Sequence, residues 1–280
     1  MSGSVIDAGA PQARAIRTVI VGASGRMGTQ LLRLLPHYPR LHLSGAVASE
    51  RSAALGRDAG LHAGAGSGAV PIGAALPPLL QQADLVIDFS SARAAAAHVA
   101  ACVAARVPLL LGTSGLPREL DAPLAAAADV IPLLVAPNTS LAVNVLLELV
   151  RQAARALPAS YDIEIVEAHH RDKADAPSGT ALALGAAAAL GRDQDLGESA
   201  AYARHGPSGA RRAGQIGFGV VRGGDVVGEH EVWFLGEGER LLLKHSATDR
   251  SVFARGALLA AQWLAGRPAG RYAMRDVFIS

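Results

Sequence analysis

Short apolar runs alternate with amphipathic or alanine-rich stretches over the first half of the chain. These runs cover residues 17–21, 41–48, 84–89, 107–111 and 130–135. Continuous runs of Val, Ile, Leu and Ala are typical of strands that are buried on both faces. The stretches between the runs predict helices over residues 26–35, 92–105 and 117–128, and residues 62–78 predict a loop with at most a short strand. Strands that alternate with helices predict a parallel sheet covered by helices.

After a predicted helix over residues 141–157, the pattern changes to an alternation of polar and apolar residues. Such alternation is typical of a strand with one covered face and one open face. Strands of this kind are predicted at residues 161–168, 215–221, 225–235 and 239–246. Two more helices are predicted, over residues 180–190 and 252–264.

The two patterns together predict an α/β fold in which an N-terminal Rossmann-type parallel sheet is followed by a smaller α+β domain, whose sheet is antiparallel or mixed and open on one face. We expect a flexible tail at residues 1–16 and a dinucleotide-binding domain at residues 17–139. The second domain is expected at residues 140–249, and residues 250–280 are expected to return to the first domain.

Composition narrows the class of protein. Half of the residues are hydrophobic and 18% are charged, which is not the composition of a disordered chain. The net charge of +2 and the absence of a basic block argue against a general nucleic-acid binder. One Cys in 280 residues excludes an intrachain disulfide and a zinc or iron–sulfur site built on several cysteines. We therefore expect a cytoplasmic protein, and no membrane segment, because prolines and asparagines interrupt the longest apolar stretch, residues 130–147.

Gly22, Gly25 and Gly28 form a G-x-x-G-x-x-G pattern between the first predicted strand and the first predicted helix. A diphosphate must approach backbone N–H groups closely, and the start of a helix offers free donors and partial positive charge. The pattern predicts a dinucleotide-binding loop, and the alternative is a tight structural turn without a nucleotide.

The residues that follow the second strand determine which dinucleotide is preferred. An acidic side chain there favours the 2′-hydroxyl of NAD, and an arginine accommodates the 2′-phosphate of NADP. Glu50 and Arg51 offer both, so the preference stays open, and each is also interpretable as a solvated loop charge. Gly112 to Ser114 and Ala136 to Thr139 follow later strands, at the edge of the sheet where ligands of such folds bind.

Residues 167–182, EAHHRDKADAPSGTAL, are the most informative segment. His169, His170, Arg171 and Lys173 crowd the end of a predicted strand, and Ser178 is placed to cap the helix that follows. Because the first N–H groups of a helix lack carbonyl partners, this segment predicts a site for an anionic small molecule. A metal site is not expected, since adjacent histidines on a strand point to opposite faces. The remaining alternative is a pair of surface histidines beside a capped helix.

These motifs resemble the dihydrodipicolinate reductase family, also called 4-hydroxy-tetrahydrodipicolinate reductases, of bacterial diaminopimelate and lysine biosynthesis. The resemblance extends from about residue 17 to residue 277. Its markers are GASGRMG (22–28), IDFS (87–90), GTSG (112–115), APNTSLAVNV (136–145), EAHHRDKADAPSGTA (167–181), IGFGVVRGGDVVGEHEV (216–232) and MRDV (274–277). It implies reduction of 4-hydroxy-tetrahydrodipicolinate by NADH, NADPH or both, and a homotetramer assembled through the open sheet of the substrate domain.

The resemblance also implies a role for each matched residue. His169 corresponds to a proton donor or acceptor and Lys173 to a second catalytic group, while His170, Gly179 and Thr180 correspond to substrate contacts, which we extend to the capping Ser178. The implied cofactor contacts are Gly22, Ala23, Ser24, Gly25, Arg26, Met27, Gly112, Thr113, Ser114, Ala136, Pro137, Asn138 and Thr139. The ribose-reading acid of the family aligns with Ser49 or Glu50.

Two other functions remain open at this point. A nucleotide-sensing Rossmann protein that regulates a partner without turnover needs the glycine loop but not Lys173 and residues 178–180. A different NAD(P)-dependent reductase of an amino-acid pathway is the nearer alternative. Oxidation of the reduced cofactor in the presence of the expected substrate distinguishes the three.

Overall fold

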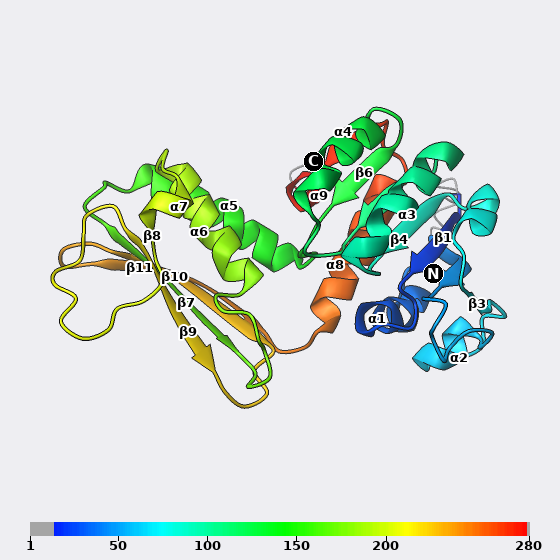
Figure 1. Ribbon diagram of the computed structural model, residues 1–280, viewed down its shortest axis with the longest axis horizontal. Coiled ribbons are helices and arrows are strands. Elements are labelled where there is room, and N and C mark those ends of the chain that lie inside the picture. Colours follow the sequence, from blue (N-terminus) through cyan, green and yellow to red (C-terminus); the bar gives the residue numbers. More distant parts are fainter. Residues whose placement is uncertain (1–13, 279–280) are drawn as a thin grey trace, which may run out of the picture. The chain divides into compact units, whose positions relative to one another are not determined.

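The computed structural model describes residues 14–278, which form two compact units (Figure 1). The first unit comprises the chain up to Pro137 together with Ala257–Tyr272. The second comprises Asn138–Gly256 and the residues from Ala273 onward. Most of the tail expected at residues 1–16 lies outside the described residues, and Ile16 already belongs to the first strand. No helix within residues 14–278 is long and apolar enough to cross a membrane.

The first unit is built on a seven-stranded sheet in which all paired strands are parallel. The spatial order is β12-β6-β5-β4-β1-β2-β3. The strands are β1 (Ile16–Val21), β2 (Leu41–Val47), β3 (Ile72–Gly73), β4 (Leu85–Asp88), β5 (Leu109–Leu111), β6 (Pro132–Val135) and β12 (Gly270–Tyr272). Apart from β12, this is the strand order of a Rossmann fold, so the predicted Rossmann-type sheet is confirmed.

The helices of this unit follow the strands as the alternating pattern predicted. They are α1 (Arg26–Leu34), α2 (Ala59–Ala63), α3 (Ala92–Ala105) and α4 (Asp121–Ala128), with 3-10 turns at Leu35–His37, Pro77–Gln82 and Arg118–Leu120. The helix expected from residue 117 begins four residues later, because Pro117 has an extended backbone and a 3-10 turn precedes α4. Val19, Val86 and Leu109 are fully buried in the core, as expected of strands covered on both faces.

The second unit is built on a mixed five-stranded sheet in the order β11-β10-β7-β9-β8. Its strands are β7 (Asp162–His169), β8 (Ala200–Ala201), β9 (Ile216–Arg222), β10 (Gly228–Leu235) and β11 (Arg240–Ala247). Strand β10 is antiparallel to β7 and β11, whereas β7 and β8 are parallel to β9. This confirms the predicted mixed sheet.

Two helices, α5 (Leu141–Ala156) and α6 (Gly179–Gly191), cover one face of this sheet (Figure 1). Leu146 and Val150 of α5 pack in one core with Ile163 and Ile165 of β7 and with Phe234 of β10. Alternate residues of β7 and β10 are buried, which is the physical reason for the alternation in the sequence.

Five short elements were not predicted: α2, α7 (Leu196–Ser199), β8, β12 and α9 (Met274–Phe278). Each has five residues or fewer, which is too short for a hydrophobic period to be recognised. Helix α8 (Ser251–Leu264) leads from the second unit into the first, where β12 pairs with β6, and α9 lies in the second unit beside α5.

An ion pair joins the first residues of β1 to the residue that precedes β4. The backbone N of Arg17 donates to Oδ2 of Asp84 at 2.9 Å, and its guanidinium donates to both carboxylate oxygens at 3.0 and 2.9 Å. The hydrogen bond from the side chain of Arg17 is the main reason that the pKa of Asp84 falls to about 2. The pair therefore stabilises the start of two neighbouring strands.

We expect Asp84→Asn to lower the free energy of unfolding by about 1–2 kcal/mol at pH 7. A carboxyl whose pKa is lowered by folding contributes fully above about pH 4, and this contribution is lost as the pH falls through about 2. The difference between wild type and variant should therefore shrink between pH 5 and pH 2, roughly, in urea titrations at each pH. Asp129→Asn, at an exposed position, is the control. A difference that is independent of pH would contradict this account.

Candidate functional site

The glycine loop turns from the carboxyl end of β1 into helix α1. Gly25 is the N-cap of α1, no side chain caps the helix there, and its first turn contains no acidic residue. The amides of the first turn therefore lack an anionic partner from their own helix, while the start of the helix carries partial positive charge. An anion such as a diphosphate fits this arrangement.

Two glycines make a close approach that no other residue allows. Gly22 has a φ of 81°, and a Cβ built on it would lie 2.5 Å from the carbonyl oxygen of Phe89. A Cβ on Gly28 would collide with the carbonyl oxygen of Gly22. The loop is thus held closely between β4 and α1, and free amides remain at the start of α1, so a dinucleotide fits this loop better than the alternative of a purely structural turn.

The other cofactor residues predicted in the first unit lie at the same edge of the sheet as this loop. Because β6, β5, β4, β1 and β2 are adjacent and parallel, their carboxyl ends meet at one edge. The Oγ1 of Thr113, just after β5, is buried and has no hydrogen-bond partner among the described residues. Such an orphaned hydroxyl is suited to a ligand group that it could bind.

The loop after β2 is tied to the glycine loop through Ser52, whose Oγ lies 3.0 Å from the Oγ of Ser24. Glu50 and Arg51 are both exposed on this loop. The structure thus keeps an acidic and a basic side chain available beside the glycine loop, and the preference between NAD and NADP stays open.

A hydrogen-bonded pair lies behind this edge of the first unit. Asp88, at the end of β4, is fully buried and binds Nδ1 of His98 at 2.8 Å. It also accepts from the backbone N of Ser90 at 2.8 Å. The pair fixes the turn after β4, whose Phe89 carbonyl packs against Gly22.

The second unit gathers a different set of polar side chains on the covered face of its sheet, at the end of β7. Glu167 is 1% exposed, and its Oε2 accepts from Nδ1 of His169 at 2.6 Å and from Nη1 of Arg222 at 2.7 Å. Its Oε1 accepts from Nη2 of Arg222 at 2.7 Å and from the backbone N of Ser178 at 2.9 Å. The carboxylate thus binds β7, β9 and the start of α6 together.

The start of α6 has the capped geometry that the sequence predicted. The Oγ of Ser178 accepts from the backbone N of Ala181 at 3.2 Å and lies 3.1 Å from Nε2 of His230, on β10. Gly179 is exposed, Thr180 is half-buried, and helix geometry gives their N–H groups no carbonyl partner within the helix. Asn138, predicted as a cofactor contact, donates from Nδ2 to Oγ1 of Thr180 at 3.0 Å within this unit.

Two cationic side chains pair with residues of the segment that joins β7 to α6. Nζ of Lys173 pairs with Oδ1 of Asp175 at 2.8 Å, and this hydrogen bond is the main reason that the pKa of Asp175 is lowered. Arg250 donates from Nη2 to Nε2 of His170 at 3.0 Å. Of the residues predicted for the substrate, His169, His170, Lys173, Ser178, Gly179 and Thr180 all lie at this end of the second unit.

Glu167, Arg222, His230 and Arg250 were not singled out from the sequence. Glu167 did leave a signal, because the alternation of β7 places it on the same face as the core residues Ile163 and Ile165. A charged residue at a core-facing position indicates a buried partner. Arg222 and His230 come from distant strands, and only the pairing of the sheet brings them to Glu167.

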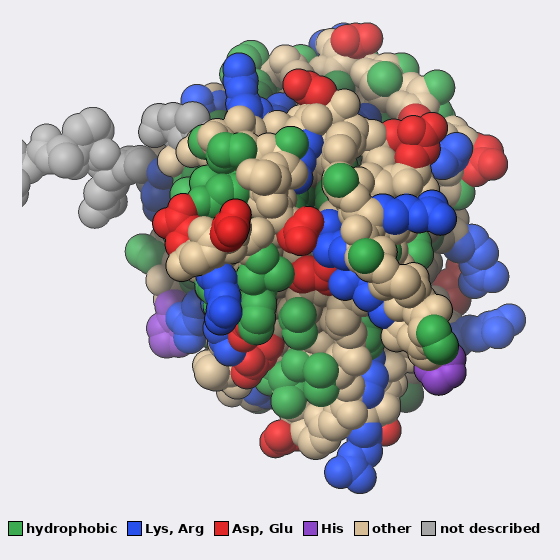
Figure 2. Space-filling view, turned by 90° about the vertical axis from the view of Figure 1, so that its left-hand side faces the viewer, with side chains coloured by type: hydrophobic (Ala, Val, Ile, Leu, Met, Phe, Trp, Pro, Cys, Tyr) green, Lys and Arg blue, Asp and Glu red, His purple; other side chains and the backbone are tan. Residues whose placement is uncertain are grey.

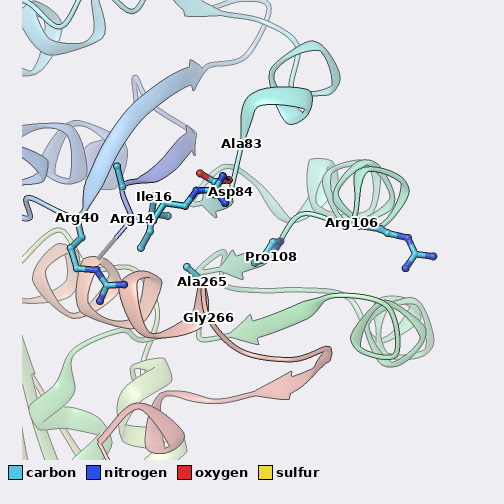
Figure 3. A pocket seen from close by; sticks show the side chains of 10 residues that line it. Arg14, Ile16, Arg40, Ala83, Asp84, Arg106, Pro108, Ala265 and Gly266 are labelled. Carbon is cyan, nitrogen blue, oxygen red and sulfur yellow. Dashed lines mark hydrogen bonds and ion pairs between the residues drawn. The ribbon is translucent and has the colours of Figure 1, made fainter. Parts of the chain in front are cut away.

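A cavity of about 400 Å³ lies elsewhere in the first unit (Figure 3). Its lining residues precede β1, β2, β4 and β5, so it opens at the amino ends of the strands rather than at the carboxyl ends. Figure 3 shows Arg14 beside Asp84 and the guanidinium of Arg106 directed away from the cavity. None of the predicted cofactor residues lines it, so it is not the expected cofactor site.

Comparison with known proteins gives a consistent result for both units. Residues 16–139 match the model described as "Dihydrodipicolinate reductase, N-terminus", and residues 142–278 match "Dihydrodipicolinate reductase, C-terminus". The 4-hydroxy-tetrahydrodipicolinate reductase of Anaeromyxobacter dehalogenans is 51% identical over 93% of this chain and 97% of that protein. The enzyme of the same name from Myxococcus xanthus is 48% identical over 94% and 97%.

Solved structures share the fold. The dipicolinate-bound dihydrodipicolinate reductase of Paenisporosarcina sp. TG-14 has a TM-score of 0.74 at 24% identity, with 92% of this chain and 97% of that chain covered. GenD2 from gentamicin A biosynthesis, in complex with NAD, has a TM-score of 0.58 at 15% identity, with 98% and 93% covered. The first unit accordingly has a nucleotide-binding fold.

We expect Gly28→Ala to weaken dinucleotide binding, because the added methyl group would push α1 away from the carbonyl of Gly22 and open the loop. Fluorescence titration with NADH and NADPH measures the affinity, which we expect to fall at least 10²-fold, a loss of about 3 kcal/mol of binding free energy. Gly266→Ala is the matched control, since a Cβ there meets open space. Undiminished binding by a folded Gly28→Ala protein would mean that the loop does not hold the cofactor.

Proposed function

Since the chain belongs to the dihydrodipicolinate reductase family and is an oxidoreductase, a 4-hydroxy-tetrahydrodipicolinate reductase, we propose the following division of roles within it. The first unit binds NADH or NADPH, and the second binds 4-hydroxy-tetrahydrodipicolinate, which is reduced to tetrahydrodipicolinate in the diaminopimelate and lysine pathway. The observation that carries the substrate assignment is the capped start of α6, which Glu167 joins to the end of β7, the strand that His170 and Lys173 follow.

The cofactor is assigned to the glycine loop. Gly22, Ala23, Ser24, Gly25, Arg26 and Met27 would hold the diphosphate, and Glu50 or Arg51 the adenosine ribose. Residues 112–114 and 136–139 would contact the remainder of the cofactor. When bound, the dihydronicotinamide supplies a hydride. The fit rests on the uncovered amides of α1 and on the orphaned hydroxyl of Thr113.

The substrate is a cyclic imine with two carboxylates, and the second unit offers a separate kind of partner for each negative charge. The amides of Gly179 and Thr180 suit one carboxylate, because a helix start binds anions through its free N–H groups. The hydroxyl of Thr180 is oriented by Asn138 and adds a further hydrogen bond. Lys173 and His170 suit the other carboxylate or the ring nitrogen. That a relative of the same family has been solved with dipicolinate bound supports this assignment.

The net reaction replaces the ring hydroxyl by hydrogen, so one hydride and one proton enter and one water leaves. Lys173 is assigned as the proton donor, because its ammonium carries three N–H groups and Asp175 holds it at the substrate end of the unit. His169 is the second catalytic residue.

The open face of the second unit's sheet is assigned to assembly into a homotetramer. Apolar residues lie on this face beside charged ones, and Val221 and Leu242 are 52% and 47% exposed. Figure 2 shows a face of the molecule on which hydrophobic side chains are interspersed with Lys, Arg, Asp and Glu. Glu229 and Glu231 are already paired with Lys244 of β11, so burial of this face would not leave them without a partner. The proposed location is the cytoplasm, where this pathway operates.

The proposed reaction is tested by mixing the chain with freshly made product of dihydrodipicolinate synthase and following the loss of reduced-nicotinamide absorbance, with NADH and NADPH in parallel. We expect turnover by the wild type and at least about a 10²-fold lower kcat for Lys173→Ala, because the proton donor is lost. Arg155→Ala, at an exposed position in the last turn of α5, is the control. Cofactor binding without turnover would favour the nucleotide-sensing regulator instead.

Assembly is tested by sedimentation equilibrium. We expect four copies for the wild type and smaller species for Leu242→Glu. Burying an unpaired carboxylate on the open face would cost more free energy than the contact between subunits contributes. Leu61→Glu, at a position that is 64% exposed in the first unit, should leave the assembly unchanged. A monomeric wild type would rule out this assignment.

A further inference from the structure

The charge state of Glu167 fixes where the hydrogens of its neighbours lie. Burial raises the pKa of Glu167, but the hydrogen bonds from Arg222, His169 and the backbone of Ser178 lower it by more, so the net pKa lies below its usual range. The side chain is therefore an ionised carboxylate at neutral pH. An ionised carboxylate only accepts hydrogen bonds, so the contact of 2.6 Å between its Oε2 and Nδ1 of His169 requires a hydrogen on Nδ1.

The second nitrogen of the His169 ring then carries a lone pair. Burial is the main cause that lowers the pKa of His169, and Lys173 and Arg222 add to it, while Glu167 opposes it. The net pKa lies below the ordinary value of about 6.5, so the ring is mainly neutral at pH 7. A neutral imidazole with its hydrogen on Nδ1 has an acceptor, and no donor, at Nε2.

We propose that Glu167 is the positioning residue of this site: it holds His169 in the tautomer whose Nε2 accepts a proton or hydrogen bond, and the same carboxylate fixes the residue that caps α6. The inference rests on the proposed reductase function. It decides between the two roles, proton donor or proton acceptor, that the resemblance leaves open for His169. At neutral pH His169 has no hydrogen on Nε2 to give, so the donated proton comes from Lys173.

The backbone leaves room at the nitrogen that this proposal uses. Gly228, the first residue of β10, lies beside the His169 ring, and a Cβ built on it would stand 3.0 Å from Nε2. Glycine at this position therefore keeps the space next to Nε2 free of side-chain atoms. A Cβ there would crowd Nε2 without touching the hydrogen bond at Nδ1.

The groups that face His169 come from every element packed around it. Glu167 lies on its own strand, Arg222 on β9, and Lys173 on the loop that follows β7. His230 of β10 packs edge-on against the ring with centroids 5.1 Å apart, and burial lowers its pKa to about 4, so it stays neutral as well. His245 of β11, opposite His230, is the next titratable group outward. Glu167 is thus the anion among these groups that supports a charge on His169.

The tautomer is measured directly by nitrogen-15 NMR of the imidazole nitrogens, with the His169 signals assigned by their loss in His169→Asn. We expect the wild type, without ligands, to show a protonated Nδ1 and an unprotonated Nε2. In Glu167→Gln the amide can present either an oxygen or an NH₂ group to Nδ1, so we expect a mixture of tautomers or the reverse one. This measurement needs no turnover, so it stays informative if the proposed function fails.

Kinetics provide the second measurement. We expect Glu167→Gln to lower kcat by about 10²-fold. The acid limb of its kcat/KM profile should move to lower pH, because loss of the carboxylate lowers the pKa of His169 further. If Glu167 only stabilised the fold, its replacement would not shift the acid limb of the kcat/KM profile. Glu164→Gln is the matched control, since Glu164 lies on the same strand, faces the other side of the sheet and pairs with Arg204 and Arg211. Glu164→Gln should change neither the tautomer of His169 nor the acid limb of the kcat/KM profile.

Glu167→Gln leaves Arg222 without its anion, so a second variant covers the case in which the protein does not fold. Gly228→Ala should keep the wild-type tautomer and cofactor affinity but reduce kcat/KM by at least about 10-fold, because Nε2 is crowded. A wild-type His169 with its hydrogen on Nε2 would overturn the proposal. So would Gly228→Ala with full activity, or a folded Glu167→Gln protein with an unchanged tautomer and acid limb.

Discussion

A carboxylate with almost no contact to solvent is costly unless donors replace the water that it has lost, and Glu167 is such a group. Its four hydrogen bonds come from a guanidinium, an imidazole and a backbone amide. Because these donors belong to β9, to β7 and to the start of α6, the requirement to satisfy one charge holds three elements in a fixed relation. This one carboxylate therefore positions both the start of α6, which suits a substrate carboxylate, and the imidazole of His169, which suits a proton.

The first unit meets a different constraint, which is the close approach of backbone to backbone. The turn after β1 passes so near to Phe89 and to the start of α1 that only glycine fits at Gly22 and Gly28. The amides of Gly22 and Ala23 both donate to the carbonyl of Val47, so the free amides are those at the start of α1, at the carboxyl edge of a parallel sheet, where open α/β folds bind their ligands. Both units thus offer the free N–H groups of a helix start to an anion, and each has ionisable side chains nearby: Glu50 and Arg51 on the loop after β2 in the first unit, and Lys173 on the loop after β7 in the second.

Much of this was accessible from the sequence because it depends on local rules. The apolar runs predicted the parallel strands, and the alternation in residues 161–168 predicted a strand with one covered face. Ser178 was recognised as a cap because a hydroxyl before a helix binds the orphaned amides. The 3-10 turn before α4 and the strands β8 and β12 were not predicted, since two or three residues are too few for a hydrophobic pattern to be recognised.

By itself, the sequence determined the Rossmann-type sheet, the mixed sheet after it, the glycine loop and the cluster around His169 and Lys173, because each is encoded within a few consecutive residues. Tertiary structure alone decided the partners of that cluster. Arg222 and His230 are 55 and 63 residues from Glu167 along the chain, and Arg250 is 80 residues from His170. Strand pairing brings Arg222 and His230 to Glu167, and the loop after β11 carries Arg250 to His170. No local pattern encodes which strands will be neighbours. The hydrogen position on His169 follows from those partners, so it too belongs to the fold.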